Sequence, residues 1–182
     1  ESNLQRMAQY CHKNKLNLRP HTKTHKSPDI AKMQVAQGFP GITRAKVGEA
    51  EVMVENDLTD ILIAYPVVGL IKVQRLCRLA KKAKLAVALD STEAAEGIAS
   101  EAARQGVTID VLAEINVGMN RVGVETPEQL VSLAEKISRM KGLRLRGIAC
   151  YPGNLFCKPS EQEVPLRRLG EQLMDVRARF RA

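Results

Sequence analysis

Short apolar runs alternate along the chain with longer stretches in which apolar residues recur every three or four positions. Near-continuous apolar runs predict strands at residues 60–66 and 85–89, and shorter or more mixed segments predict strands at residues 41–43, 109–115 and 143–151. The longer stretches predict helices at residues 4–10, 28–38, 48–56, 68–82, 92–105, 126–140 and 165–180. Strict alternation with short connections predicts parallel strands joined by right-handed crossovers.

Several helix ends are marked by their flanking residues. Ser27 before Pro28 is typical of an N-cap followed by proline in the first helical position, and Thr126 before Pro127 repeats the pattern. The run at 60–66 is almost continuously apolar, as in a strand buried on both faces of a parallel sheet.

A further strand is expected at residues 18–26, and its two faces differ. One face would carry four basic residues, Arg19, His21, Lys23 and His25. This row fits a strand that faces a polar, anion-holding site, and it fits equally a solvated edge strand with Pro20 at the edge. In the first interpretation Lys23 has the most cationic neighbours, which favour its neutral, nucleophilic amine.

Metal and disulfide chemistry receive little support. On a strand, His21 and His25 would lie about 13 Å apart, too far to share one ion. The four cysteines form no Cys-x-x-Cys pair and no zinc-ligand spacing with a histidine, so we expect reduced thiols in a cytoplasmic protein.

The element count leaves two architectures open. Roughly six strands, each followed by a helix, fit a doubly wound sheet or a (β/α)8 barrel. A complete barrel needs eight strands and about 250 residues, whereas this chain has 182. As a barrel it would lack one strand before its first helix and at least one after its last. We therefore expect a part of a longer protein, an open sheet, or a sheet that another chain closes.

Charge and hydropathy argue against two classes of partner. The formal net charge is +8, but the basic residues are spread over several predicted helices without interleaved aromatic residues, so we expect no nucleic-acid partner. No apolar run approaches the roughly 18 residues needed to span a bilayer, and the start is unlike a signal peptide. We expect a cytoplasmic protein that does not bind membranes.

Candidate chemistry gathers where the predicted strands end, the usual place for sites in parallel sheets. Lys23 ends the first strand, and Tyr151 ends the last, as a core tyrosine or at the rim of a site. Arg121 lies in a glycine-containing loop, at the surface or as a fixed cation at a site mouth. Glu114, inside a strand, needs a cationic partner, and Arg121 or Lys23 could serve. Asp90 and Ser91 are expected to cap the next helix.

Residues 19–26, RPHTKTHK, resemble the R-P-H-x-K-x-H-K signature of D-threonine aldolases and eukaryotic-type D-serine dehydratases. These are fold-type III pyridoxal-phosphate (PLP) enzymes, related to the N-terminal barrel of alanine racemase. The resemblance continues through residues 41–43, 49–51, 60–66, 114–123 and 147–153. It implies that residues 1–182 are part of a PLP-binding (β/α)8 TIM-type barrel, without its first strand, its last part and the C-terminal β-domain.

The resemblance also implies roles for individual residues. Lys23 matches the family's Schiff-base lysine, Arg121 matches the arginine near the phenolate oxygen of the cofactor, and Tyr151 matches a tyrosine at the site mouth. We also expect His21 to contact the cofactor. The implied function is a PLP-dependent lyase acting on a β-hydroxy-D-amino acid. The alternatives are a non-catalytic PLP carrier and an amino-acid racemase, although Glu114 stands where racemases tend to carry a lysine.

The chain departs from the family pattern in places. Asn116 stands where the family often has Asp, and Asn154 where it often has His. The family's phosphate site and the ligands of its divalent metal, zinc or manganese, would lie beyond residue 182. We therefore expect the complete protein to be a homodimer that uses the metal, and this part alone to be inactive.

Overall fold

The structure is a computed structural model that describes residues 2–180. One sheet of parallel strands forms its centre, with strands β1 (Ile42–Arg44), β2 (Asp60–Ile63), β3 (Lys84–Leu89), β4 (Ile109–Glu114) and β5 (Leu143–Ala149). The helices are α1 (Ser2–Lys13), α2 (Pro28–Val35), α3 (Val47–Val54), α4 (Leu70–Leu79), α5 (Thr92–Gln105), α6 (Pro127–Ser138), the 3-10 helix η1 (Pro159–Glu161) and α7 (Glu163–Arg179).

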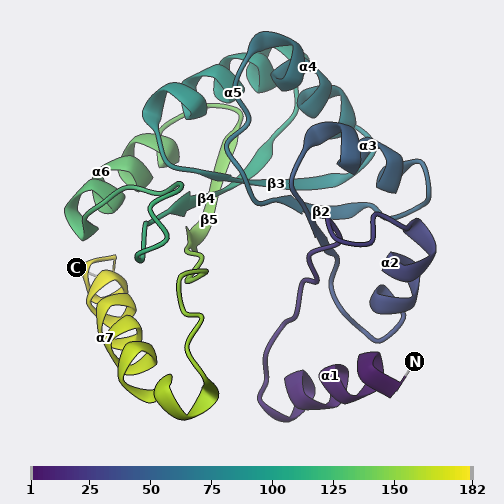
Figure 1. Ribbon diagram of the computed structural model, residues 1–182. Coiled ribbons are helices and arrows are strands. Elements are labelled where there is room, and N and C mark those ends of the chain that lie inside the picture. The colour runs from purple at the N-terminus through teal and green to yellow at the C-terminus, as the bar shows by residue number, and fades with distance from the viewer. Residues whose placement is uncertain (1, 181–182) are drawn as a thin grey trace.

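The strands lie in the sheet in chain order, β1-β2-β3-β4-β5. A doubly wound sheet would reverse this order at its centre and carry helices on both faces. Here the sheet curves into an arc with α3 to α6 along its outer side, while α1 and α7 lie at the two ends of the arc (Figure 1). The prediction of an incomplete (β/α)8 barrel is therefore confirmed, and the doubly wound alternative is wrong.

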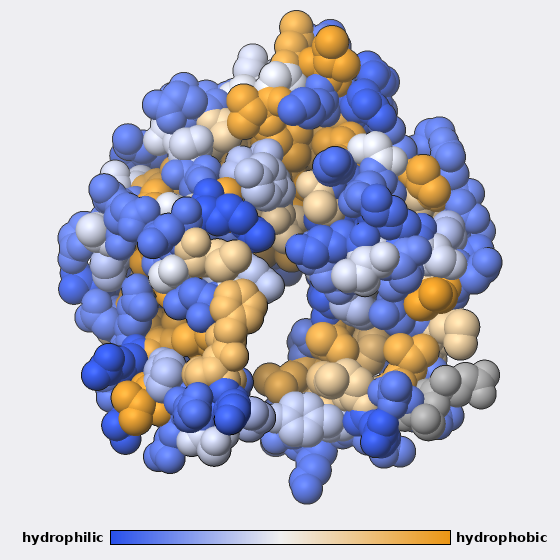
Figure 2. Space-filling view, viewed as in Figure 1, coloured by the Kyte–Doolittle hydropathy of each residue, from blue (hydrophilic) through white to orange (hydrophobic). Residues whose placement is uncertain are grey.

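The sheet buries one face more completely than the other. In β2, Ile61 and Ile63 are fully buried, whereas Asp60 and Leu62 are half-buried. The predicted burial of this strand on both faces is thus wrong, because the helices cover only the outer face of the arc. The inner side is hollowed between the two ends of the chain (Figure 2).

Local capping rules account for the helix ends. The Ser27 hydroxyl accepts a hydrogen bond from the Ile30 N–H, and Ser91 caps α5 in the same way. Thr126 forms a capping box with Gln129, and Gly106 ends α5 in the left-handed conformation with φ +67°. These boundaries agree with the sequence prediction.

The predicted strand at residues 18–26 is wrong except for the single bridge residue His21. The segment pairs with β1 through one bridge, His21 to Thr43, and the chain then turns, with the Lys26 N–H donating to the Thr22 carbonyl at 2.9 Å. The reason is that β1 ends at Arg44, so a longer strand would find no partner. Residues 22–25 form a turn, and the expected row of four basic side chains does not exist.

Arg19 holds the other end of this segment. Its guanidinium lies 2.8 Å from the Asp60 carboxylate and 3.1 Å from the Asp60 carbonyl oxygen, at the amino end of β2. Arg19 therefore ties the incoming chain to the sheet, away from the strand ends where a site is expected. Gly41 makes room for this contact, because a Cβ there would collide with both the Arg19 guanidinium and the Asp60 carbonyl oxygen.

We expect Gly41→Ala to lower the free energy of unfolding by about 2–3 kcal/mol, the usual cost of forcing an atom into a packed site. Denaturant titration followed by circular dichroism measures this. A Cβ added at Gly97 in α5 would meet no neighbouring side chain or element within 4 Å, so Gly97→Ala should stabilise the protein by about 0.5–1 kcal/mol. Equal effects of the two substitutions would contradict the steric account.

Candidate active site

The carboxyl ends of the parallel strands bring two groups of polar side chains to the same edge of the arc. One group follows the short segment beside β1 and contains His21 and Lys23. The other follows β4 and β5 and contains Glu114, Arg121 and Tyr151. In the sheet, β2 and β3 lie between the two groups. Among residues 2–180, no hydrogen bond or ion pair joins them.

Lys23 is exposed and lies in the turn that follows the His21 bridge. Its backbone N–H donates to Nδ1 of His21 at 3.3 Å, which leaves the proton of the neutral imidazole on Nε2. Burial lowers the pKa of His21, and the charges of Lys23 and Arg44 lower it further. A neutral imidazole therefore stands beside an exposed lysine.

Arg44 belongs to this group, although no sequence motif singled it out. It is only 2% exposed. Its Nη1 donates to the carbonyl and the hydroxyl oxygens of Thr22, at 2.9 and 2.6 Å. Its Nε lies 3.6 Å from the carboxylate of Glu49 in the first turn of α3. The available signal was a charged residue directly after the predicted strand at residues 41–43, where a buried cation requires partners.

Asn116 organises the loop that carries Arg121. Its Oδ1 accepts hydrogen bonds from the N–H groups of Gly118 and Asn120, at 3.0 and 3.1 Å. Its Nδ2 donates to Asn120 Oδ1 at 2.8 Å and to the Glu125 carboxylate at 3.0 Å. One buried amide therefore fixes both sides of the loop.

The loop closes against the neighbouring strand end through Gly123. Its N–H donates to Asp90 Oδ2 at 3.1 Å, and its φ of +101° favours glycine. A Cβ at Gly123 would also collide with the backbone of Ile115 and Asn116. Of the two residues expected to cap α5, Ser91 alone does so, while Asp90 holds this loop.

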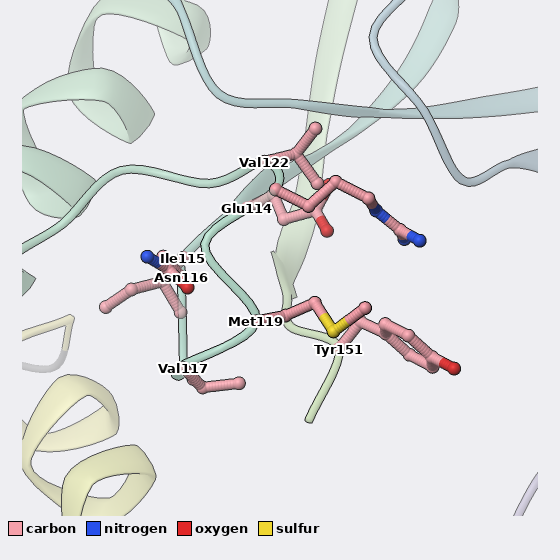
Figure 3. A pocket seen from close by; sticks show the side chains of 8 residues that line it. Glu114, Ile115, Asn116, Val117, Met119, Val122 and Tyr151 are labelled. Atoms are coloured by element: carbon pink, nitrogen blue, oxygen red, sulfur yellow. The ribbon is translucent and has the colours of Figure 1, made fainter. Parts of the chain in front are cut away.

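Arg121 and Tyr151 meet at the mouth of a small pocket. The Arg121 guanidinium carbon lies 5.2 Å from the centre of the Tyr151 ring, within range of a cation–π contact. Tyr151 is 51% exposed, and its ring projects outward beside Met119 (Figure 3). Both predicted residues therefore line one pocket, with Tyr151 at the rim rather than in the core.

Glu114 lies at the base of the same pocket (Figure 3). It is 5% exposed, and its Oε2 has no hydrogen-bond partner among the described residues. Burial raises the pKa of Glu114, the nearby Asp90 raises it further, and Arg121 opposes the rise. The expected ion pair with Arg121 or Lys23 does not form among residues 2–180, because Arg121 extends over Tyr151 and Lys23 lies beyond β2 and β3.

The raised pKa of Glu114 predicts a pH-dependent effect on stability. A carboxyl group with a raised pKa in the fold stabilises it below the ordinary pKa of 4.5, and this contribution is lost as the pH rises through the raised value. Glu114→Gln removes the loss. We expect the stability of the variant relative to the natural protein to increase as the pH rises above 4.5, as measured by denaturant titration. A difference that stays constant with pH would contradict this.

The chain is an arc of a parallel β/α barrel that brings an amine, an imidazole, a guanidinium and a phenol to the carboxyl ends of its strands, the edge at which barrels of this class carry their sites. Comparison with known families makes the class specific. The family model described as alanine racemase, N-terminal domain, matches residues 1–181. The chain belongs to this family.

Individual relatives refine the comparison. The chain is 36% identical over 155 residues to a D-threonine aldolase of Arthrobacter sp.. The aligned region covers 85% of this chain and 41% of the relative. It is 32% identical over 157 residues to the D-threo-3-hydroxyaspartate dehydratase of Delftia sp. (strain HT23), covering 86% of this chain and 41% of the relative. The chain thus spans about two-fifths of the length of these curated relatives.

A crystal structure of the D-threonine aldolase from Filomicrobium marinum superposes on the chain with a TM-score of 0.92 at 39% identity. The match covers 97% of this chain and 47% of the aldolase. The resemblance inferred from the sequence motifs is therefore confirmed.

Proposed function

We propose that this chain is part of a PLP-dependent lyase that acts on β-hydroxy-D-amino acids, and that Lys23 holds the cofactor covalently through its Nζ. The observation that carries the proposal is the position of Lys23. Its amine is exposed at the carboxyl edge of a barrel arc, in a turn tied to β1, beside a histidine whose pKa is lowered. The relatives named as aldolase and dehydratase support the reaction class.

The side chains at this edge fit the proposed cofactor. The Lys23 amine suits an aldehyde, and the Arg121 guanidinium suits a phenolate oxygen. The unpartnered Oε2 of Glu114 leaves one buried acceptor in the Arg121 pocket for a donor. When bound, PLP supplies an electron sink that weakens the bonds to the α-carbon of an amino acid.

The role proposed for the neighbouring residues of the chain is to bind and orient the cofactor. His21 has Nδ1 tied to the Lys23 backbone, so Nε2 is the ring atom that can donate a hydrogen bond. Arg121 supplies fixed positive charge at the pocket mouth, and the Tyr151 ring holds its guanidinium from one side. Asn116 keeps the loop that carries Arg121 in place.

Borohydride trapping tests the proposal. The protein is incubated with PLP, reduced, digested, and searched by mass spectrometry for a pyridoxyl-lysine peptide. We expect the tag on Lys23. A tag on Lys26 instead would overturn the assignment of the lysine, and no tag on any lysine of the longest natural form of the protein would overturn PLP binding.

Product analysis separates the reaction types. Glycine and an aldehyde from D-threonine would indicate an aldolase, and a keto acid with ammonia from D-serine would indicate a dehydratase. The L-enantiomer as product would indicate a racemase. A trapped Lys23 without turnover by the longest natural form would indicate a carrier.

Further properties of the complete protein remain proposals. We propose a cytoplasmic homodimer that uses a divalent metal, zinc or manganese. In the part of the chain that the structure describes, no cluster of three histidine, cysteine or acidic residues could hold a metal ion. No helix within residues 2–180 has the length and apolar composition to cross a membrane. Light scattering and metal analysis of the purified protein test the dimer and the metal.

A further inference from the structure

Arg44 is an unusual residue for its position, since it closes β1 with its side chain almost entirely out of solvent, at 2% exposure. A buried guanidinium is costly unless hydrogen bonds and an opposite charge compensate it. An apolar residue of similar volume would often be as stable or more stable at such a position. The contacts of Arg44 therefore indicate which part of the structure its charge stabilises.

Those contacts are few and directed. Nη1 donates to both oxygen atoms of Thr22, the carbonyl at 2.9 Å and the hydroxyl at 2.6 Å. Nε faces Glu49 Oε2 at 3.6 Å and has no hydrogen bond among the described residues. Glu49 is itself anchored, because its Oε2 accepts a hydrogen bond from the Ala45 N–H at 3.2 Å.

Thr22 is fully buried, and its polar groups are all used. Its N–H and its hydroxyl both donate to the Thr43 carbonyl, at 3.0 and 3.2 Å. Its carbonyl accepts from Arg44 and also from the Lys26 N–H at 2.9 Å, the bond that closes the turn. Arg44 therefore holds the residue at which the chain leaves β1 and enters the turn.

Lys23 is the next residue in the chain. Its side chain is exposed, and its backbone N–H bonds to His21. The described residues thus locate the Lys23 amine mainly through the backbone on either side of it. Reacting groups need such positioning, since a misplacement of about 1 Å can cost roughly 100-fold in rate.

We infer that Arg44 is a positioning residue for Lys23, with Glu49 as its counter-ion. Arg44 acts through Thr22, and no hydrogen bond joins its guanidinium to the lysine amine among the described residues. The inference rests on the proposed function for its catalytic meaning, while the structural part, that Arg44 holds the turn of residues 22–26, stands separately.

The test uses four variants of the chain. Arg44→Met removes the charge and the hydrogen bonds, and Arg44→Lys restores the charge. Thr22→Val removes the hydroxyl that Arg44 contacts with little change in volume, and Thr22→Ser keeps it as the matched control. Thermal unfolding first establishes which variants are folded.

Two readouts follow for each folded variant. Hydrogen exchange reports the Lys26 amide, which closes the turn, and the borohydride trap reports pyridoxyl-Lys23 against pyridoxyl-Lys26. We expect Arg44→Met and Thr22→Val to speed exchange at Lys26 by roughly tenfold and to lower the Lys23 to Lys26 ratio by a similar factor. Arg44→Lys should keep part of the slow exchange at Lys26 and part of the Lys23 to Lys26 ratio of the natural protein. Thr22→Ser should keep most of each.

The outcomes separate the two claims. If the natural protein is tagged at Lys23 and both readouts stay unchanged in folded Arg44→Met, the inference is overturned. If Arg44→Met does not fold, the contrast between Thr22→Val and Thr22→Ser decides in the same way. If the natural protein is not tagged at Lys23, the proposed function fails, and the exchange of the Lys26 amide alone decides whether Arg44 holds the turn.

Discussion

Replacing Lys23 with alanine is expected to abolish the visible absorption band of bound PLP and to lower turnover of D-threonine or D-serine on the order of 10³-fold or more. The reason is that the amine at this position is the group proposed to hold the cofactor. Lys23 is exposed, so the substitution removes little packing, and the thermal unfolding midpoint should change little. Absorbance titration with PLP and steady-state kinetics on the longest natural form measure the effect.

The neighbouring lysine provides the matched control. Lys26 lies in the same turn and is also accessible to solvent, so Lys26→Ala removes a similar charge without removing the proposed nucleophile. We expect Lys26→Ala to keep the absorption band and most of the turnover. Full activity in Lys23→Ala, or equal losses in both variants, would disprove the proposed role of Lys23.

Asn116→Ala is expected to lower the free energy of unfolding by about 1–3 kcal/mol, because it removes the hydrogen bonds through which the buried Asn116 amide holds the loop. Asn116 is 8% exposed and bonds to Gly118, Asn120 and Glu125. Loss of these bonds also releases the loop that carries Arg121, so affinity for PLP should fall as well. Urea titration followed by circular dichroism gives the first quantity, and absorbance titration with PLP gives the second.

Asn116→Asp distinguishes the acceptor role of Asn116 Oδ1 from the donor role of its Nδ2. A carboxylate keeps the acceptor for Gly118 and Asn120, but it would face the Glu125 carboxylate, now 3.0 Å from Nδ2. We expect Asn116→Asp to destabilise the protein at neutral pH and the added change Glu125→Gln to recover much of the loss. A loss below about 0.5 kcal/mol for Asn116→Ala would show that the loop does not depend on Asn116.

The elements of the fold were predictable because each one depends on local rules. Segments rich in apolar residues formed β2 to β5, and serine or threonine caps with a following proline marked the starts of α2 and α6. The segment at residues 18–26 was mispredicted because alternation alone does not tell whether a strand has a partner. The length of β1, which ends at Arg44, sets that limit and is a tertiary property.

The site was predictable in its residue types but not in all its contacts. The sequence pointed to Lys23, Arg121 and Tyr151, and the structure brings the latter two together. The sequence did not reveal that the Arg121 side chain would contact Tyr151 and leave Glu114 Oε2 without a partner among the described residues. Which of several nearby partners a long side chain takes depends on three-dimensional geometry, so sequence spacing cannot decide it.

The order of the strands in the sheet has a consequence for how the chain folds. Each strand pairs with the strands that directly precede and follow it in the chain, so among the described residues every strand pairing spans a single β/α unit. Each parallel pairing must close a loop that contains a helix, which slows folding, but no pairing has to wait for a strand from a distant part of the chain. During synthesis, each new β/α unit can add to the edge left by the unit before it, so the arc is expected to grow from β1 towards β5 as the chain leaves the ribosome.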